Sequence, residues 1–162
     1  HIGVCNYSSG LLPDLMNSCE TKPEILQIES HPYLTQEKLI RLAKDYGIEV
    51  TAFSPLGSIS YEELGGAEES ESILKNKIVQ SISKDIGITP AQLILGWCLN
   101  RGTSIVVKST NEIRMKENLA ASSVKLQQSI IDKISALNEN KRYNDPGIVC
   151  EDAFNTFFPI YE

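Results

Sequence analysis

A lysine, two hydroxyl residues and a helix start follow one another at residues 108–114. An apolar run at residues 104–107 predicts a buried strand, and the Lys-Ser-Thr sequence of residues 108–110 ends it. A helix should begin at about Asn111 and carry Arg114 within its first turn or so. The first N–H groups of a helix lack partners within it, its dipole favours negative charge, and lysine and arginine both bind phosphate. The pattern therefore predicts a site for a phosphate-bearing ligand such as a nucleotide. An ordinary capped helix with solvated charges is the alternative.

Apolar strands and amphipathic helices alternate along the chain around this site. We expect strands at residues 2–7, 25–28, 48–53 and 104–108, and helices at residues 11–19, 35–46, 73–86, 89–100, 111–120 and 127–137. Thr35 and Thr89 are the expected caps of the helices that follow them. We expect a polar loop at residues 59–71 and an irregular tail at residues 138–162. Alternation of this kind predicts an α/β fold with parallel strands and right-handed crossovers.

Four βα units could form a small open sheet or half of an eight-stranded barrel. Polar side chains, among them Asn6 and Gln27, lie at or near the carboxyl ends of the expected strands, where both architectures bind ligands. No GxGxxG follows the first strand, and no GxxxxGK[ST] occurs. The expected phosphate site follows the last strand, which is the usual position in a barrel. The pattern therefore favours half of a TIM (β/α)8 barrel.

Length and composition restrict the class of protein. The 162 residues suit one domain, and the formal charge of −6 argues against broad nucleic-acid or anionic-membrane binding. The four cysteines are scattered, form no CxxC pair and have no metal-like spacing to either histidine, so we expect reduced thiols, no metal and a cytoplasmic protein. No apolar run could span a bilayer. The chain opens on His1 rather than Met, which suggests a piece of a longer protein.

Five segments, in order along the chain, resemble the motifs of one enzyme family. They are IGVCNY at residues 2–7, QIESHPYL at 27–34, TAFSPLG at 51–57, KSxxxxRxxEN at 108–118 and RYNDP at 142–146. They resemble the aldo-keto reductases, NADPH-dependent (β/α)8-barrel enzymes of the aldose and xylose reductase types. The resemblance covers only the C-terminal half of that fold. It implies a single domain over residues 1–162, with four βα units and extra helices in 1–137 and a C-terminal loop in 138–162.

The resemblance also implies a binding site for NADP(H). Asn6 and Gln27 would bind the nicotinamide carboxamide, since an amide offers both a donor and an acceptor. Phe53 would stack under the nicotinamide ring in place of the family's usual tyrosine. Cys5 replaces a serine and would be a weaker hydrogen-bonding group. The implied set is Cys5, Asn6, Gln27, Phe53, Ser54, Leu56, Ser58, Lys108, Ser109, Thr110, Arg114, Glu117 and Asn118.

Within that set, residues 54–58 would hold the pyrophosphate through Ser54, Leu56 and Ser58. Lys108, Ser109 and Arg114 would bind the adenosine 2′-phosphate, and Glu117 with Asn118 would contact the adenine. Each residue also has a structural alternative. The two amides could satisfy buried backbone groups, Phe53 could be a core residue, residues 54–57 could be a simple turn, and Glu117 could pair with a neighbouring cation.

The family reduces aldehydes and ketones by hydride transfer, with a tyrosine acid assisted by lysine, aspartate and histidine. The resemblance places all four in the half that this chain does not include, so no catalytic residue is assigned and the chain alone is expected to be inactive. The apolar tail at residues 148–161, with Phe158 among its aromatic residues, would line the substrate pocket. A half barrel has unpaired edge strands, so we expect it to pair with the missing N-terminal half or with itself.

Two functions follow from these observations. In the first, the chain is the cofactor-binding half of an NADP(H)-dependent reductase whose substrate is a small carbonyl compound. In the second, it is a catalytically inactive half barrel that binds a nucleotide or a protein. An upstream coding segment that carries the catalytic residues would support the first, whereas a stop codon just before His1 would support the second.

Overall fold

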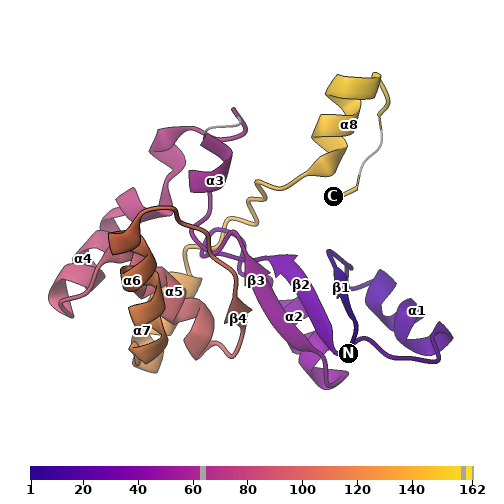
Figure 1. The fold of residues 1–162 in the computed structure, drawn as a ribbon, viewed down its shortest axis with the longest axis horizontal. Coiled ribbons are helices and arrows are strands. Elements are labelled where there is room, and N and C mark those ends of the chain that lie inside the picture. Colours follow the sequence, from indigo (N-terminus) through magenta and orange to yellow (C-terminus); the bar gives the residue numbers. More distant parts are fainter. Residues whose placement is uncertain (63–64, 158–159, 162) are drawn as a thin grey trace.

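Four parallel strands alternate with helices along the chain (Figure 1). The computed structural model describes residues 1–62, 65–157 and 160–161. The strands are β1 (Gly3–Cys5), β2 (Ile25–Glu29), β3 (Glu49–Phe53) and β4 (Ser104–Ile105), and they pair in the order β1-β2-β3-β4. The helices are α1 (Leu11–Ser18), α2 (Glu37–Asp45), α3 (Ile59–Glu62), α4 (Lys77–Asp85), α5 (Pro90–Asn100), α6 (Glu112–Ala120), α7 (Gln128–Ser135) and α8 (Pro146–Phe154). Short 3₁₀ turns occur at Glu69–Glu71, Ile73–Lys75 and Ala121–Ser123.

Alternating burial along β2 and β3 shows which face of the sheet the helices cover. Leu26 and Ile28 of β2 and Val50 and Ala52 of β3 are buried, whereas the residues between them keep solvent contact. The buried side chains include members of a core that α1 and α2 also line. An open nucleotide-binding sheet reverses its strand order and carries helices on both faces. The sequential order and the single covered face match part of a (β/α)8 barrel, as the sequence predicts.

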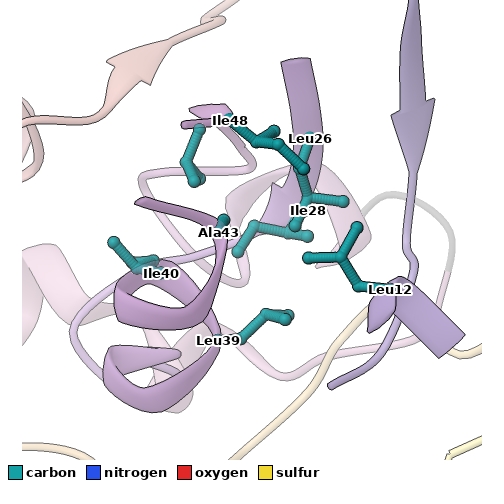
Figure 2. Close-up of a cluster of buried hydrophobic side chains, with 8 residues drawn as sticks. Leu12, Leu26, Ile28, Leu39, Ile40, Ala43 and Ile48 are labelled. Carbon is teal, nitrogen blue, oxygen red and sulfur yellow. The ribbon is translucent and has the colours of Figure 1, made fainter. Parts of the chain in front are cut away.

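The first hydrophobic core lies between β2, β3 and α2, with α1 at its edge (Figure 2). Leu39, Ile40 and Ala43 lie on one face of α2, as the helical spacing predicts, and all three are buried. They pack with Leu12 of α1 and with the outward side chains of the strands. Burial of each large apolar side chain stabilises the fold by about 1.5–3 kcal/mol. This core holds α1 and α2 against the sheet.

A second core surrounds α5, which packs between α4 and α7. Trp97 and Cys98 are buried here, and the Trp97 indole N–H donates to Ser135 Oγ at 3.1 Å. The predicted start of α5 is confirmed, because Thr89 caps it in a capping box with Gln92. A Cβ on Gly96 would lie 2.8 Å from Val124 Cγ1, so α5 and the segment after α6 pack too closely for any side chain there.

Several element boundaries differ from the sequence prediction. Gln36 rather than Thr35 precedes α2 and has a left-handed φ of 54°. Thr35 instead bonds outside α2, with its backbone N–H to Asn138 and its carbonyl to Arg101. The predicted strand at residues 104–108 ends at Ile105.

Two segments predicted to be irregular contain helices. The loop at 59–71 holds α3 and a 3₁₀ turn, although its residues 63 and 64 lie outside the described residues. The tail at 138–162 holds α8, while Phe158 lies outside the described residues. Asp145 Oδ1 accepts from the N–H of Gly147 at 2.9 Å and so caps α8. Among the described residues, no helix is both long and apolar enough to cross a bilayer.

The buried carboxylate of Glu29 joins the end of β2 to the C-terminal segment. Its oxygens accept from the backbone N–H groups of Tyr143 at 2.8 Å and Asn144 at 3.1 Å. His31 Nε2 lies 3.1 Å and an Arg142 nitrogen 3.5 Å from the same carboxylate. Burial alone would raise the pKa of Glu29, but the hydrogen bonds from His31 and Tyr143 outweigh it and hold the pKa below its ordinary value. The carboxylate therefore stays ionised and holds the segment against the sheet.

Candidate functional site

Cys5, Asn6 and Gln27 lie together at the carboxyl ends of β1 and β2. Cys5 is directly opposite Gln27 in the register, with its Sγ 4.0 Å from Gln27 Oε1. The Asn6 N–H donates to the Gln27 carbonyl at 2.9 Å, and Asn6 has a left-handed φ of 58°. Among the described residues, no group hydrogen-bonds to the buried Asn6 Oδ1. Buried polar atoms are normally paired, so this oxygen is suited to accept a hydrogen bond from a ligand amide.

A cavity of about 340 Å³ lies between the turn after β3 and the chain after β4. From the expected cofactor set it is lined by Phe53, Ser54, Leu56 and Lys108. Ser54 has a left-handed φ of 47°, which is strained for a residue other than glycine. Its Oγ lies 3.0 Å from the hydroxyl of Tyr61. The cavity thus brings together an aromatic ring, a tight turn and a cation.

A second cavity, of about 530 Å³, lies between the chain after β4 and α6. Lys108, Ser109 and Asn118 of the expected set line it, together with the apolar side chains of Met115 and Leu119. Lys108 lines both cavities and so stands between them. This second cavity offers polar groups for a phosphate and an apolar surface for a flat ring.

The start of α6 is less open to an anion than the sequence suggests. Asn111 Oδ1 accepts from the N–H of Arg114 at 3.0 Å, and Ser109 Oγ accepts from the N–H of Asn111 at 3.1 Å. One of the free N–H groups of the first turn is therefore already satisfied by a side chain. In the described part of the chain, no hydrogen bond is recorded for the N–H groups of Glu112 and Ile113, which could therefore bind a ligand.

Seven residues of the expected set line neither of these two cavities. Three of them, Cys5, Asn6 and Gln27, lie at the ends of β1 and β2, and Asn6 lines a separate cavity of about 440 Å³. Thr110 and Arg114 are exposed, and Glu117 is half-buried with its carbonyl accepting from Gln92 Nε2 at 3.4 Å. Ser58 is buried and its hydroxyl donates to Glu62 Oε1 at 3.2 Å.

Sequence reasoning missed part of the lining of the two cavities. Val106 and Val107 were assigned to a buried strand, yet they keep 46% and 37% of their surface exposed and line the first cavity. Met115 and Leu119 of α6 line the second. Their spacing of four residues on an exposed helix face was a signal that could have found them.

The four thiols differ in burial and should differ in reactivity. Burial raises the pKa of Cys98 to about 12, whereas Cys5 is exposed and burial raises its pKa less. Because the thiolate is the reactive form, we expect iodoacetamide at pH 8 to label Cys5 in the folded chain and Cys98 only after unfolding. Peptide mass spectrometry would measure both rates, with Cys5→Ser as the control. Equal labelling of Cys98 and Cys5 in the folded chain would contradict the burial described.

Within the described residues, no group of three or more His, Cys, Asp or Glu side chains could hold a metal ion.

Comparison with known proteins gives a consistent match. Residues 1–139 match the sequence model described as the aldo/keto reductase family. The chain is 43% identical over 147 residues to a probable NAD(P)H-dependent D-xylose reductase of Aspergillus terreus, which covers 90% of this chain and 46% of that protein. It is 42% identical to the corresponding protein of Aspergillus fumigatus, with 90% and 47% covered, and 40% identical to a D-xylose reductase of Aspergillus niger, with 90% and 46% covered. The chain thus spans about half the length of these relatives.

Proposed function

Because the chain belongs to the aldo-keto reductase family, we propose that it is the cofactor-binding half of an NADP(H)-dependent reductase of aldehydes and ketones. The relatives named above are NAD(P)H-dependent D-xylose reductases and match this chain with their C-terminal portion. An aldose such as D-xylose is therefore the first substrate class to test. Residues 1–162 would form one domain with four βα units and a C-terminal loop.

The position of Lys108 between two cavities is the observation that carries this proposal. A dinucleotide is long enough to extend through both, with its nicotinamide ring at Phe53, its pyrophosphate at Ser54 and Leu56, and its adenosine beside Asn118. Lys108 would then meet the 2′-phosphate with its ammonium group.

When bound, NADPH supplies the hydride. The residues of this chain would bind it and fix which face of the ring is presented. Asn6 and Gln27 would hold the carboxamide, and Phe53 would cover one face of the ring. The resemblance assigns the proton donor and its partners to the other half of the barrel, so we assign no catalytic residue here.

Nucleotide titration tests the proposal directly. We expect the purified chain to bind NADPH at least about tenfold more tightly than NADH, because one charge-assisted hydrogen bond contributes about 1.5–3 kcal/mol. Calorimetry would measure both affinities. Equal affinities would contradict the 2′-phosphate assignment, and no binding of either nucleotide would remove the proposed function.

The same chain should show no turnover. We expect no NADPH-dependent reduction of D-xylose or a simple aldehyde above the buffer rate, measured by absorbance at saturating NADPH, since no proton donor is assigned to this half. Turnover that copurifies with the chain and disappears in Phe53→Ala would overturn the assignment of the catalytic residues to the other half.

The edges of the sheet support a partner. β1 and β4 are the outer strands, and Ile2 and Val106 beside them keep 51% and 46% of their surface exposed. Unpaired strand edges bind other strands through their free backbone groups. We propose that a complementary half barrel or a second copy covers these edges, and sedimentation of the chain alone would distinguish a monomer from a self-associated form.

A further inference from the structure

Tyr61 contacts the proposed cofactor turn and the C-terminal segment at the same time. Its hydroxyl lies 3.0 Å from Ser54 Oγ, in the turn that lines the first cavity. Its ring stacks on Tyr143, with centroids 5.9 Å apart and an interplanar angle of 18°. Tyr61 belongs to α3, which follows this turn directly. It therefore joins two segments that lie far apart in the sequence.

Tyr143 is itself held in place from several sides. Its backbone N–H donates to the buried Glu29 carboxylate at 2.8 Å, and its ring lies 5.2 Å from the His31 ring. The turn also rests on this ring, because a Cβ on Gly57 would lie 3.7 Å from Tyr143 Cε2. The Tyr143 ring thus packs against the segment at Gly57 and at Tyr61.

Ser54 is the point at which this support matters. It is held in the left-handed region at φ 47°, and such a conformation persists only where the surroundings determine it. The hydroxyl–hydroxyl contact with Tyr61 is the side-chain hydrogen bond that Ser54 makes among the described residues. Loss of that bond would leave the hydrogen bond from the Gly57 N–H to the Ser54 carbonyl, at 2.9 Å, as the link across the turn, so we expect the turn to become more mobile.

We propose that Tyr61 is a positioning residue of the nucleotide site, which acts through Ser54 and is itself set by Tyr143. Docking of the C-terminal segment on Glu29 would thereby control the shape of the turn that holds the pyrophosphate. This inference rests on the proposed function for the identity of the ligand. The positioning itself concerns only contacts within the chain, so it can be tested without any ligand.

The first test measures hydrogen exchange of the peptide that spans residues 54–62, in the 162-residue chain without nucleotide. Tyr61→Phe removes the hydroxyl and keeps the stacked ring, so we expect exchange in this peptide to become about threefold to tenfold faster. Tyr46→Phe is the matched control, since Tyr46 lies at the end of α2 and should leave the peptide unchanged. Unchanged exchange in Tyr61→Phe would overturn the proposal whether or not the chain binds nucleotide.

The second test compares two nucleotides. NADPH has a pyrophosphate, whereas adenosine 2′,5′-bisphosphate carries the 2′-phosphate and only one phosphate on the 5′ side. Tyr61→Phe should weaken NADPH about threefold to tenfold and the bisphosphate less than about twofold. Equal losses for the two nucleotides would indicate general damage to the fold and overturn the positioning role.

A mutant cycle and a conservative rescue complete the design. In the chain without nucleotide, Ser54→Ala should lose exchange protection in the peptide of residues 54–62 as Tyr61→Phe does, and the double variant should lose no more than either single variant, because both remove the same hydroxyl–hydroxyl contact. Tyr143→Leu should reproduce the selective loss and Tyr143→Phe should restore NADPH binding. Additive losses in the cycle would overturn the coupling. If the unmodified chain does not bind NADPH, the proposed function fails, and the exchange measurement alone still decides the positioning role.

Discussion

Replacing Lys108 with alanine should weaken NADPH binding about tenfold to a hundredfold and change NADH binding by less than about threefold. Lys108 lines both cavities, and its ammonium group is the cation that the proposed pose places at the 2′-phosphate. NADH has a hydroxyl in place of that phosphate, so it loses little when the cation is removed. Calorimetric titration of both cofactors into the variant and the unmodified chain would measure the difference.

Arg114 tests how much of the phosphate site lies on α6. It is exposed and lines neither of the two cavities of the cofactor site, so we expect Arg114→Ala to have a smaller effect than Lys108→Ala. The double variant should approach the larger loss. Lys116→Ala is the matched control, because Lys116 is exposed on the same helix and pairs with Glu112. Equal losses for NADPH and NADH in the Lys108 variant would eliminate the 2′-phosphate assignment.

The second large effect is expected at Glu29. Glu29→Ala removes a fully buried carboxylate that accepts from two backbone N–H groups and faces His31 and Arg142. Removal of one partner of such a buried network leaves the others unsatisfied and costs about 3–5 kcal/mol of unfolding free energy. Urea denaturation would measure the loss, with the exposed Glu112→Gln as the control. A loss no larger than that of the control would contradict the network.

The lowered pKa of Glu29 should make the folded chain less stable in acid. The pKa of Glu29 in the folded chain is below that of the unfolded chain, so its contribution is present above about pH 4.3 and lost as the pH falls through the folded value. We expect the unfolding free energy to decrease more steeply with acid in the unmodified chain than in Glu29→Gln. If the unfolding free energy fell equally steeply with pH in both chains between pH 5 and pH 3, the lowered pKa of Glu29 would be refuted.

The contacts around Glu29 could not be predicted from the sequence. QIESHPYL and RYNDP were both visible as motifs, but nothing in either indicates that they meet. Glu29 and Tyr143 are 114 residues apart, and the two hydrogen bonds that join the carboxylate to the RYNDP segment at Tyr143 and Asn144 come from backbone N–H groups. A backbone donor carries no residue-type signal, so only the fold reveals this contact.

Local signals gave better predictions than tertiary ones. Thr89 and Pro90 start α5 and Gly87, with φ 71°, follows α4, because caps and left-handed turns depend on a few adjacent residues. Thr35 looked like an equally good cap, yet tertiary bonds occupy its backbone groups. The start of α8 at Asp145 and Pro146 has the same cap and proline pattern as α5 and was overlooked in a segment read as irregular.

The proximity of some of the expected cofactor residues could be predicted because strand order determines it. Polar residues at the carboxyl ends of parallel strands must meet at one edge, and this places Phe53 and Ser54 in one cavity with Lys108. Positions beyond the strand ends depend on how loops turn, and there Ser58 and Thr110 lie outside the two cavities.

The single tryptophan of the chain, Trp97, is a fluorescent probe at a known position in the fold. Trp97 is buried in the second core, among α4, α5 and α7, and not in the core beside β1 and β2. Its fluorescence emission will therefore report on unfolding of the second core. Far-ultraviolet circular dichroism reports on the secondary structure around both cores. A difference between the denaturation midpoints measured by fluorescence and by dichroism would therefore show that the two cores unfold in separate steps.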